Sequence, residues 1–191
     1  MRITKIITIY LFLSLICFLI SCNQQLKEKP KSTLYEEFSL SNKLYLLAPE
    51  FNSKTCESFG ECDCCASNYI FLDSVNFISV DYCLEADTYY SGKYKIENEK
   101  VELKYNTLVV QKEYNWESET DSTTTEPEYK LKTEKCKSFR STWVKLNCKK
   151  KIYFKTLDEK PQYASIDKSK TSQNFLTELK KEGIMEKLYI K

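Results

Sequence analysis

Residues 92–106, GKYKIENEKVELKYN, constrain the fold more than any other segment of the chain. Apolar residues alternate with charged ones on both sides of the short ENE stretch. An alternation with a period of two places one face of a strand against the protein and the other face in water. The segment therefore predicts a β-hairpin with ENE at its turn.

Strand signals recur along most of the chain. In VNFISVDY the residues Ile78, Val80 and Tyr82 alternate with polar ones, which indicates a half-buried strand. Further candidate strands span residues 43–47, 69–72, 107–116, 129–136, 142–148 and 151–156. About eight short strands rich in Tyr, Phe and Val predict a mainly β fold, an antiparallel meander that forms a small barrel or sandwich.

One C-terminal helix is expected in TSQNFLTELKKEG, residues 171–183. Ser172 is suited to cap its start, its apolar residues fall on one face, and Gly183 is suited to end it. The segment IMEKLYI that follows is expected to return as a last strand.

The N-terminus has the layout of a secretion signal. Arg2 and Lys5 precede IITIYLFLSLICFLI, a run without charge. This run is shorter than the roughly 20 apolar residues that span a bilayer. The order of positive residues, apolar run and small residue predicts a signal peptide over residues 1–21.

The motif LISC, which ends at Cys22, resembles a bacterial lipobox. The resemblance implies that lipid is attached to the Cys22 thiol and that cleavage leaves Cys22 as the N-terminus of the mature chain. An ordinary secretory leader that ends at a cysteine is the alternative. Residues 22–33 are then expected to form a lipidated tether and residues 34–191 a single β-rich domain.

Charge excludes one class of partner. Without Arg2 and Lys5 the basic and acidic residues are equal in number, so no electrostatic argument favours nucleic acid. Residues 117–128, ESETDSTTTEPE, are expected to form an acidic mobile loop, since they lack the ordered spacing of a calcium site. Residues 130–151 carry nine basic residues against one acid, as expected for the solvated face of strands.

Besides Cys22, the expected mature chain has seven cysteines, Cys56, Cys62, Cys64, Cys65, Cys83, Cys136 and Cys148. In an oxidising compartment such cysteines most often form disulfides. An odd number leaves at least one thiol free or paired between molecules, unless a metal intervenes.

A turn near residues 140–142 predicts a disulfide between Cys136 and Cys148, and the Cys56–Cys65 cluster is expected to be tied internally and to Cys83. The full connectivity stays open. As an alternative, Cys62, Cys64 and Cys65 form a soft thiolate array suited to Cu(I) or Zn(II), which Cys56 or Cys83 would complete. A redox role for the Cys62-x-x-Cys65 spacing is disfavoured, because the motif leads into a strand and not a helix.

The chain has no histidine and three glycines. Catalytic arrangements built on histidine and Gly-rich phosphate loops are therefore excluded. We expect a protein that is not an enzyme and that has no cofactor.

The run FLDSVNFISVDYCLEADTYYSGKYKIENEKVELKY resembles the meander of small lipocalin-like or barrel-like lipoproteins from Bacteroidota-type envelopes. The resemblance implies a lipid-anchored envelope protein whose β-domain binds a small apolar ligand, a glycan or another envelope protein. Since the tether has no acidic cluster, the periplasmic face of the outer membrane is the expected location. The second hypothesis is a thiolate metal-binding or metal-sensing lipoprotein that uses the Cys56–Cys65 cluster.

Overall fold

The structure is a computed structural model that describes residues 38–60, 63–116 and 128–188. The expected signal peptide, Cys22, the tether, Cys62 and residues 117–127 of the acidic loop lie outside the described residues. The described residues from Ser39 onward form one compact unit. Its strands are β1 (Leu44–Ala48), β2 (Glu50–Asn52), β3 (Glu57–Phe59), β4 (Ala66–Phe71), β5 (Asn76–Tyr82), β6 (Ala86–Glu97), β7 (Lys100–Tyr114), β8 (Tyr129–Lys135), β9 (Arg140–Cys148), β10 (Lys151–Thr156) and β11 (Tyr163–Ile166), and its helices are α3 (Ser172–Lys181) and α4 (Ile184–Lys187).

Eight strands close into an antiparallel barrel. They follow the order β6-β5-β4-β1-β11-β10-β9-β7, and β7 pairs back with β6. The prediction of a mainly β fold with a C-terminal helix is confirmed, and the fold is a barrel rather than a sandwich. The short strands β2, β3 and β11 were not predicted from the sequence.

The predicted hairpin is the longest part of the barrel. β6 and β7 meet at a two-residue turn, where Asn98 and Glu99 have φ angles of 49° and 63°. Two consecutive positive φ angles match the right-handed twist of the flanking strands. β7 is continuous across residues 100–114, so the two separate strands expected at 101–105 and 107–116 are one.

β7 has different neighbours along its length. Lys100–Lys104 pair with the start of β9, whereas Leu108–Tyr114 pair with β8. β8 and β9 therefore lie one after the other along the same side of β7. β9 continues the ring by pairing with β10, while β8 lies outside the ring.

Aromatic side chains fill the middle of the barrel. Tyr69 on β4 and Trp143 on β9 have ring centroids 4.7 Å apart, although these strands are not neighbours in the sheet. Their contact therefore crosses the interior. The rings that join this cluster belong to Tyr45, Phe71, Phe77, Tyr94, Tyr105 and Phe154.

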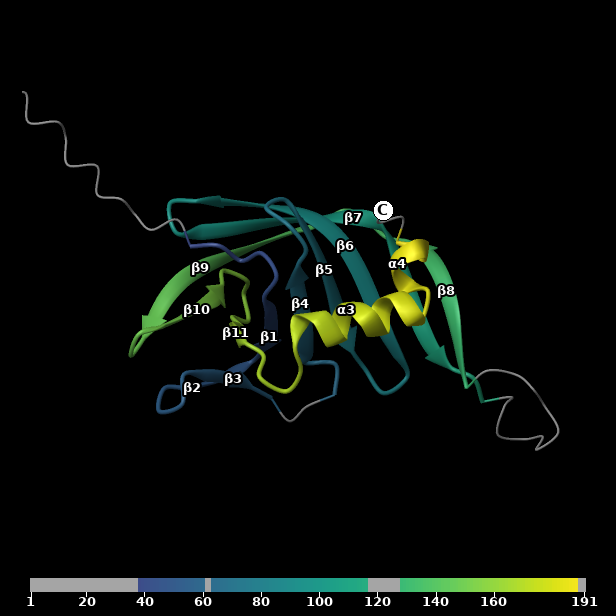
Figure 1. Cartoon of the computed structure of the whole chain (residues 1–191), viewed down its shortest axis with the longest axis horizontal. Helices are drawn as coiled ribbons and strands as arrows, with labels where there is room; N and C mark the ends of the chain where they lie inside the picture. The colour runs from purple at the N-terminus through teal and green to yellow at the C-terminus, as the bar shows by residue number, and fades with distance from the viewer. Residues whose placement is uncertain (1–37, 61–62, 117–127, 189–191) are drawn as a thin grey trace, which may run out of the picture. The chain divides into compact units, whose positions relative to one another are not determined.

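Helix α3 lies across β4, β5 and β6 in Figure 1 and covers the outer face of the sheet. Phe175 and Leu179 pack there against Ile70 and Ile78, which alternate along their strands with the interior rings. The side chain of Thr171 caps the helix by accepting the Asn174 N–H at 3.1 Å. The expected cap, Ser172, is instead the first residue of the helix.

The expectation of a strand after Gly183 is wrong for the described residues. Gly183 has a φ of +71°, and Ile184–Lys187 form α4, with Ile184 buried in the same cluster as α3. The chain turns back at the glycine, so an apolar segment with a strand-like composition completes the helical layer.

The β2–β3 hairpin lies outside the ring. The ring of Phe51 on β2 stacks on Tyr153 of β10 with centroids 4.1 Å apart. The backbone N–H of Ser58 on β3 donates to Ser165 Oγ on β11 at 2.9 Å. This hairpin is thus packed on the β10–β11 side of the barrel.

Candidate functional site

The described cysteines form disulfides in a pattern that differs in part from expectation. Cys56 is bonded to Cys148, and Cys64 to Cys83. Cys65 is disulfide-bonded as well. The expected link from the cluster to Cys83 is confirmed. The predicted Cys136–Cys148 disulfide is wrong, because Cys136 is a free, partly buried thiol.

The extended conformation of β9 explains why Cys136 and Cys148 are not bonded to each other. Arg140–Cys148 form one strand, and no turn occurs at residues 140–142. A strand rises about 3.3 Å per residue, so β9 alone separates its two ends by roughly 25 Å. Cys136 precedes β9 and Cys148 ends it, which places the two sulfurs beyond bonding distance.

The two disulfides whose cysteines are both described join different parts of the fold. Cys56 follows β2 and binds the end of β9, which attaches the outer hairpin to the barrel. Cys64 and Cys83 join the chain before β4 to the chain after β5. Such bonds persist in oxidising compartments, and they point to an extracytoplasmic location.

One group of side chains has a spacing suited to a metal ion. The ligand atoms of Asp63, Cys64 and Cys83 lie within 4.8 Å of one another at a largely exposed position. The two sulfurs are bonded to each other, and Asp63 Oδ1 accepts the N–H of Leu84 at 2.8 Å. In this oxidised state the sulfurs are not available as thiolate ligands.

Aromatic side chains inside the barrel form its core. Trp143, Phe71 and Phe77 are fully buried and contact neighbouring rings. The hydroxyls of Tyr69 and Tyr105 hydrogen-bond to each other at 2.7 Å across the interior. These rings therefore belong to the packed interior of the barrel.

Asp81 is an acid on the inner face of β5. Its Oδ1 accepts a hydrogen bond from Ser67 Oγ at 2.6 Å. Burial raises the pKa of Asp81, and hydrogen bonds from Ser67 and Tyr90 partly offset that increase. Burial, together with the negative charge of Asp81, raises the pKa of Tyr90 to about 12. This network joins three neighbouring strands, β4, β5 and β6.

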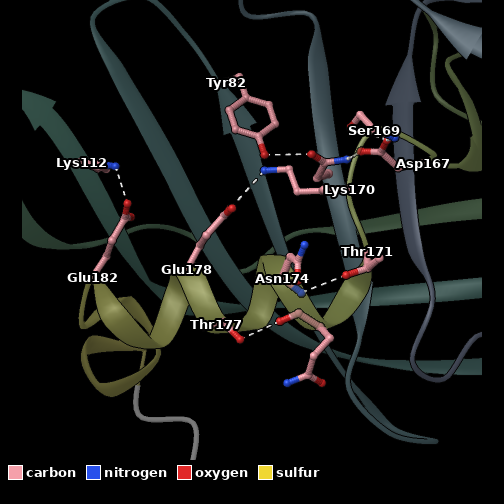
Figure 2. Close-up of polar contacts among 12 residues, drawn as sticks. Tyr82, Lys112, Asp167, Ser169, Lys170, Thr171, Asn174, Thr177, Glu178 and Glu182 are labelled. Carbon is pink, nitrogen blue, oxygen red and sulfur yellow. Dashed lines mark hydrogen bonds and ion pairs between the residues drawn. The ribbon is translucent and has the colours of Figure 1, made fainter.

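Polar contacts fix α3 on the barrel (Figure 2). Lys112 on β7 pairs with Glu182 after the helix at 2.8 Å. At the other end, Tyr82 donates to Asn68 at 2.8 Å, and Asn68 donates to Asp167 at 2.8 Å. Burial raises the pKa of Tyr82, and nearby carboxylates raise it further. The chain before the helix, at Asp167, and the chain after it, at Glu182, are thus both bound to strands of the barrel.

An exposed aromatic cluster lies where β7 ends and β8 begins. The ring centroids of Tyr114 and Trp116 are 4.7 Å apart, and those of Tyr114 and Tyr129 are 5.7 Å apart. Trp116 is 69% exposed. The ammonium of Lys112 lies 4.6 Å from the centre of the Tyr129 ring. Large exposed rings beside charged groups are typical of recognition surfaces.

The backbone of β8 has an open side. The N–H of Cys136 donates to the Thr107 carbonyl at 2.8 Å, just beyond one end of the β7–β8 ladder. The N–H of Asn115 donates to the Glu128 carbonyl at 2.8 Å, just beyond the other end. In an antiparallel ladder hydrogen-bonding residues alternate, so the even-numbered residues of β8 face β7. The odd-numbered residues, which direct their N–H and C=O groups away from β7, are Tyr129, Leu131, Thr133 and Lys135.

Within residues 38–60, 63–116 and 128–188 no strand pairs with that side of β8. Leu131 is partly buried, and the other three residues are exposed. We call this open side of Tyr129–Lys135 the β8 edge. Sequence reasoning predicted the strand and its solvated lysines, but not that the strand lies outside the ring. The alternation of lysine with other residues in YKLKTEK was the available signal, because lysine is common on edge strands.

Comparison with known proteins found no matching family, no matching curated protein and no matching solved structure. None of the described helices is long and apolar enough to cross a membrane.

Proposed function

We propose that this protein is a non-enzymatic, lipid-anchored binding protein of the cell envelope. Its disulfide-stabilised barrel acts as a rigid support, and the surface around β8 binds the ligand or partner. The observation that carries the proposal is the β8 edge, with which no described strand pairs and which lies beside Trp116, a side chain that is 69% exposed.

Two independent features support this location. The disulfides favour an oxidising compartment. The lipobox-like LISC motif predicts export from the cytosol and a lipid anchor at Cys22. Each buried methylene of an attached acyl chain contributes about 0.8 kcal/mol, so two or more chains hold a protein stably on a membrane.

The anchor is tested with Cys22→Ser in the full chain, and Cys17→Ser is the matched control. We expect Cys22→Ser to lose incorporation of labelled palmitate. The variant should either be cleaved at another site and leave the membrane fraction, or remain as the uncleaved precursor. Cys17→Ser should be processed and labelled like the unmodified chain. Equal labelling of the two variants would refute the anchor.

Enzymatic activity is the less favoured class. The chain has no histidine to act as a general base near neutral pH. Asp81, the inner-face carboxyl with a raised pKa, is held by Ser67 and Tyr90 as part of the packed interior. These features support a binding role.

A thiolate metal site is the second candidate function, and the spacing of Asp63, Cys64 and Cys83 favours it. It requires a reduced form, because each disulfide must accept two electrons, for example from a dithiol, before its sulfurs can bind metal. The test is native mass spectrometry with Zn²⁺, before and after reduction. Metal retained by the reduced protein and lost in Cys83→Ser would support this function, whereas equal retention in both would exclude the site.

A further inference from the structure

We propose that one end of the barrel binds the surface of an anionic phospholipid bilayer through four exposed lysines, Lys54, Lys149, Lys150 and Lys151. We call these four lysines the basic patch. The inference rests on the proposed lipid anchor and goes beyond it, because it adds a second contact between the protein and the membrane. Lysines close to such a surface are attracted by its negative potential.

Two turns that are far apart in the sequence form the basic patch. Lys54 lies in the β2–β3 turn, and the other three lysines lie at the β9–β10 turn. Lys149 Nζ donates to the Lys54 carbonyl at 2.6 Å, and Lys151 Nζ donates to the Thr55 carbonyl at 3.1 Å. One disulfide joins the same two turns covalently, and both lie at the left of Figure 1. The four lysines are therefore held as one group.

Neighbouring acids do not neutralise the basic patch. The two turns, residues 52–56 (NSKTC) and 147–151 (NCKKK), contain no acid. In the part of the chain that the structure describes, no carboxylate forms an ion pair with these four lysines. Glu57, the acid next to the first turn, is paired with Lys168, so this pair adds no net charge. The ammonium groups that donate to carbonyls keep their full positive charge, because a carbonyl is neutral.

The acidic segment after β7 joins the barrel elsewhere. Lys100, the first residue of β7, lies opposite Val144, and β9 continues from there to the basic patch. The acidic residues follow Trp116 at the other end of β7, roughly 45 Å along the strand. Residues 22–37, which precede the described chain, carry three lysines and three glutamates and are balanced in charge.

The fold does not require lysine at the β9–β10 turn. Lys149 and Lys150 are the two residues between the paired Cys148 and Lys151, and their φ angles are 52° and 149°. Glycine and asparagine are usual at such positions, because most side chains are strained at positive φ. Strain of this kind is tolerated most often where the residue has a function. Binding by the two exposed ammonium groups supplies such a function.

The place where the chain enters the barrel favours a membrane as the partner. β1 pairs antiparallel with β11, and β11 pairs antiparallel with β10, so the start of β1 and the start of β10 lie at the same end of the barrel. The chain therefore enters at the end that carries the basic patch. Residues 22–37 can span at most roughly 55 Å when fully extended. A lipid on Cys22 would keep this end of the barrel within that distance of the bilayer.

The four lysines can act together on one surface. Each lysine close to an anionic bilayer strengthens binding about fivefold, and the attraction falls off over about 10 Å in 0.1 M salt. Contact through the basic patch would orient the barrel as well as hold it. The exposed rings of Tyr114, Trp116 and Tyr129 lie at the opposite end of β7 and would then face away from the bilayer.

The test is sedimentation of the protein with lipid vesicles. It uses the oxidised mature chain, residues 22–191, with Cys22→Ser so that no lipid is attached. One vesicle contains phosphatidylcholine alone, and the other contains equal parts of phosphatidylcholine and phosphatidylglycerol. Because the chain carries no lipid, any binding comes from the protein itself.

Three variants of this chain separate charge from structure. The first removes three charges of the basic patch and combines Lys149→Gln, Lys150→Gln and Lys151→Gln. The second is the matched control, which removes three charges from exposed lysines elsewhere and combines Lys135→Gln, Lys137→Gln and Lys160→Gln. The third keeps the charge of the patch and places arginine at residues 149–151. Mapping of the Cys56–Cys148 disulfide in each variant verifies that the two turns are still joined.

We expect the chain with an intact patch to bind the anionic vesicle, not to bind the neutral vesicle, and to be released as the salt concentration is raised. The glutamine variant of the patch should bind about a hundredfold more weakly, from about fivefold for each lysine. The control variant should stay within about threefold of the intact patch, and the arginine variant should bind as tightly as the intact patch. These results would support the proposal.

Equal binding to the two vesicles would overturn the proposal, and so would equal losses in the patch and control variants. A loss in the arginine variant as large as that in the glutamine variant would assign the lysines a structural role instead. Release by inorganic phosphate at constant ionic strength would show a site for phosphate ions, and stronger binding to polyglutamate than to the vesicle would make an acidic polypeptide the partner. Palmitate labelling tests the anchor separately, so failure of either experiment is distinguishable from failure of the other.

Discussion

Cys56 and Cys148 are bonded across 92 residues of chain, with their Cα atoms 5.7 Å apart, and so attach the β2–β3 hairpin to the end of β9. Closing a long loop restricts the unfolded chain strongly, in the entropic account of disulfides. We predict that the double variant Cys56→Ser, Cys148→Ser loses about 2–5 kcal/mol of unfolding free energy. Urea unfolding under non-reducing conditions measures this loss.

The matched control is Cys136→Ser, which removes the free thiol. It should change the unfolding free energy by less than about 1 kcal/mol, since the change is small and the residue is only partly buried. Equal losses in the two experiments would contradict the role given to the disulfide.

Gly92 lies at the bulge of the β6–β7 hairpin, where no side chain fits. A Cβ there would lie 2.5 Å from the Phe77 ring and would also strike the carbonyl of Lys104. We predict that Gly92→Ala costs about 1–3 kcal/mol, because both neighbours belong to the packed barrel. Thermal or urea unfolding tests the value.

Gly183→Ala separates crowding from backbone strain. An added Cβ at Gly183 meets no atom within 4 Å, but the residue has a φ of +71°. The expected cost is about 1–2 kcal/mol, from the left-handed conformation alone. Phe77→Leu makes room for a side chain at Gly92 but not at Gly183. Combined with Gly92→Ala, it should recover part of the lost unfolding free energy. Combined with Gly183→Ala, it should recover none.

Asp81 gives the barrel a pH dependence of a defined sign. Its pKa is raised in the folded protein by burial, so the folded state binds the proton more tightly than the unfolded state does. The contribution of Asp81 to stability therefore falls as the pH rises above about 4, the ordinary range of an aspartate. Asp81→Asn should remove this fall, as measured by urea unfolding over a pH series.

Asp73 serves as a control, because its pKa shift and its effect on the pH dependence of stability are opposite in sign to those of Asp81. Hydrogen bonds from the side chain and backbone of Asn76 and from the backbone of Val75 lower its pKa. Its contribution is therefore present at neutral pH and is lost as the pH falls through the lowered pKa. Asp73→Asn should weaken the protein at neutral pH more than in acid. If both variants shifted the pH profile in the same direction, the assignment of Asp81 would be wrong.

Local patterns predicted local structure. The β6–β7 hairpin was predictable because its alternation and its turn lie within residues 92–106. Helix α3 was predictable for the same reason, since its cap, apolar face and terminal Gly183 lie close together. β11 was missed because its four residues, YASI, gain strand structure from pairing with β1 and β10.

Long-range relationships were not predictable in the same way. Cys148 is bonded to Cys56 because the β2–β3 hairpin packs against β10. No sequence pattern near Cys148 predicts this packing. The β8 edge likewise depends on which half of β7 closes the ring. Lysine spacing marks β8 as solvated, but only the pairing of β7 with both β8 and β9 shows that one side of β8 is open.

Disulfide mapping of the mature protein isolated without reductant tests the central claim, an exported barrel stabilised by disulfides, most directly. Thiols are blocked under denaturing conditions before proteolysis and mass spectrometry. We predict peptides that join Cys56 to Cys148 and Cys64 to Cys83, with the blocking group on Cys136. Blocking groups on Cys56, Cys64, Cys83 and Cys148 would contradict the account, and so would a peptide that joins Cys136 to Cys148.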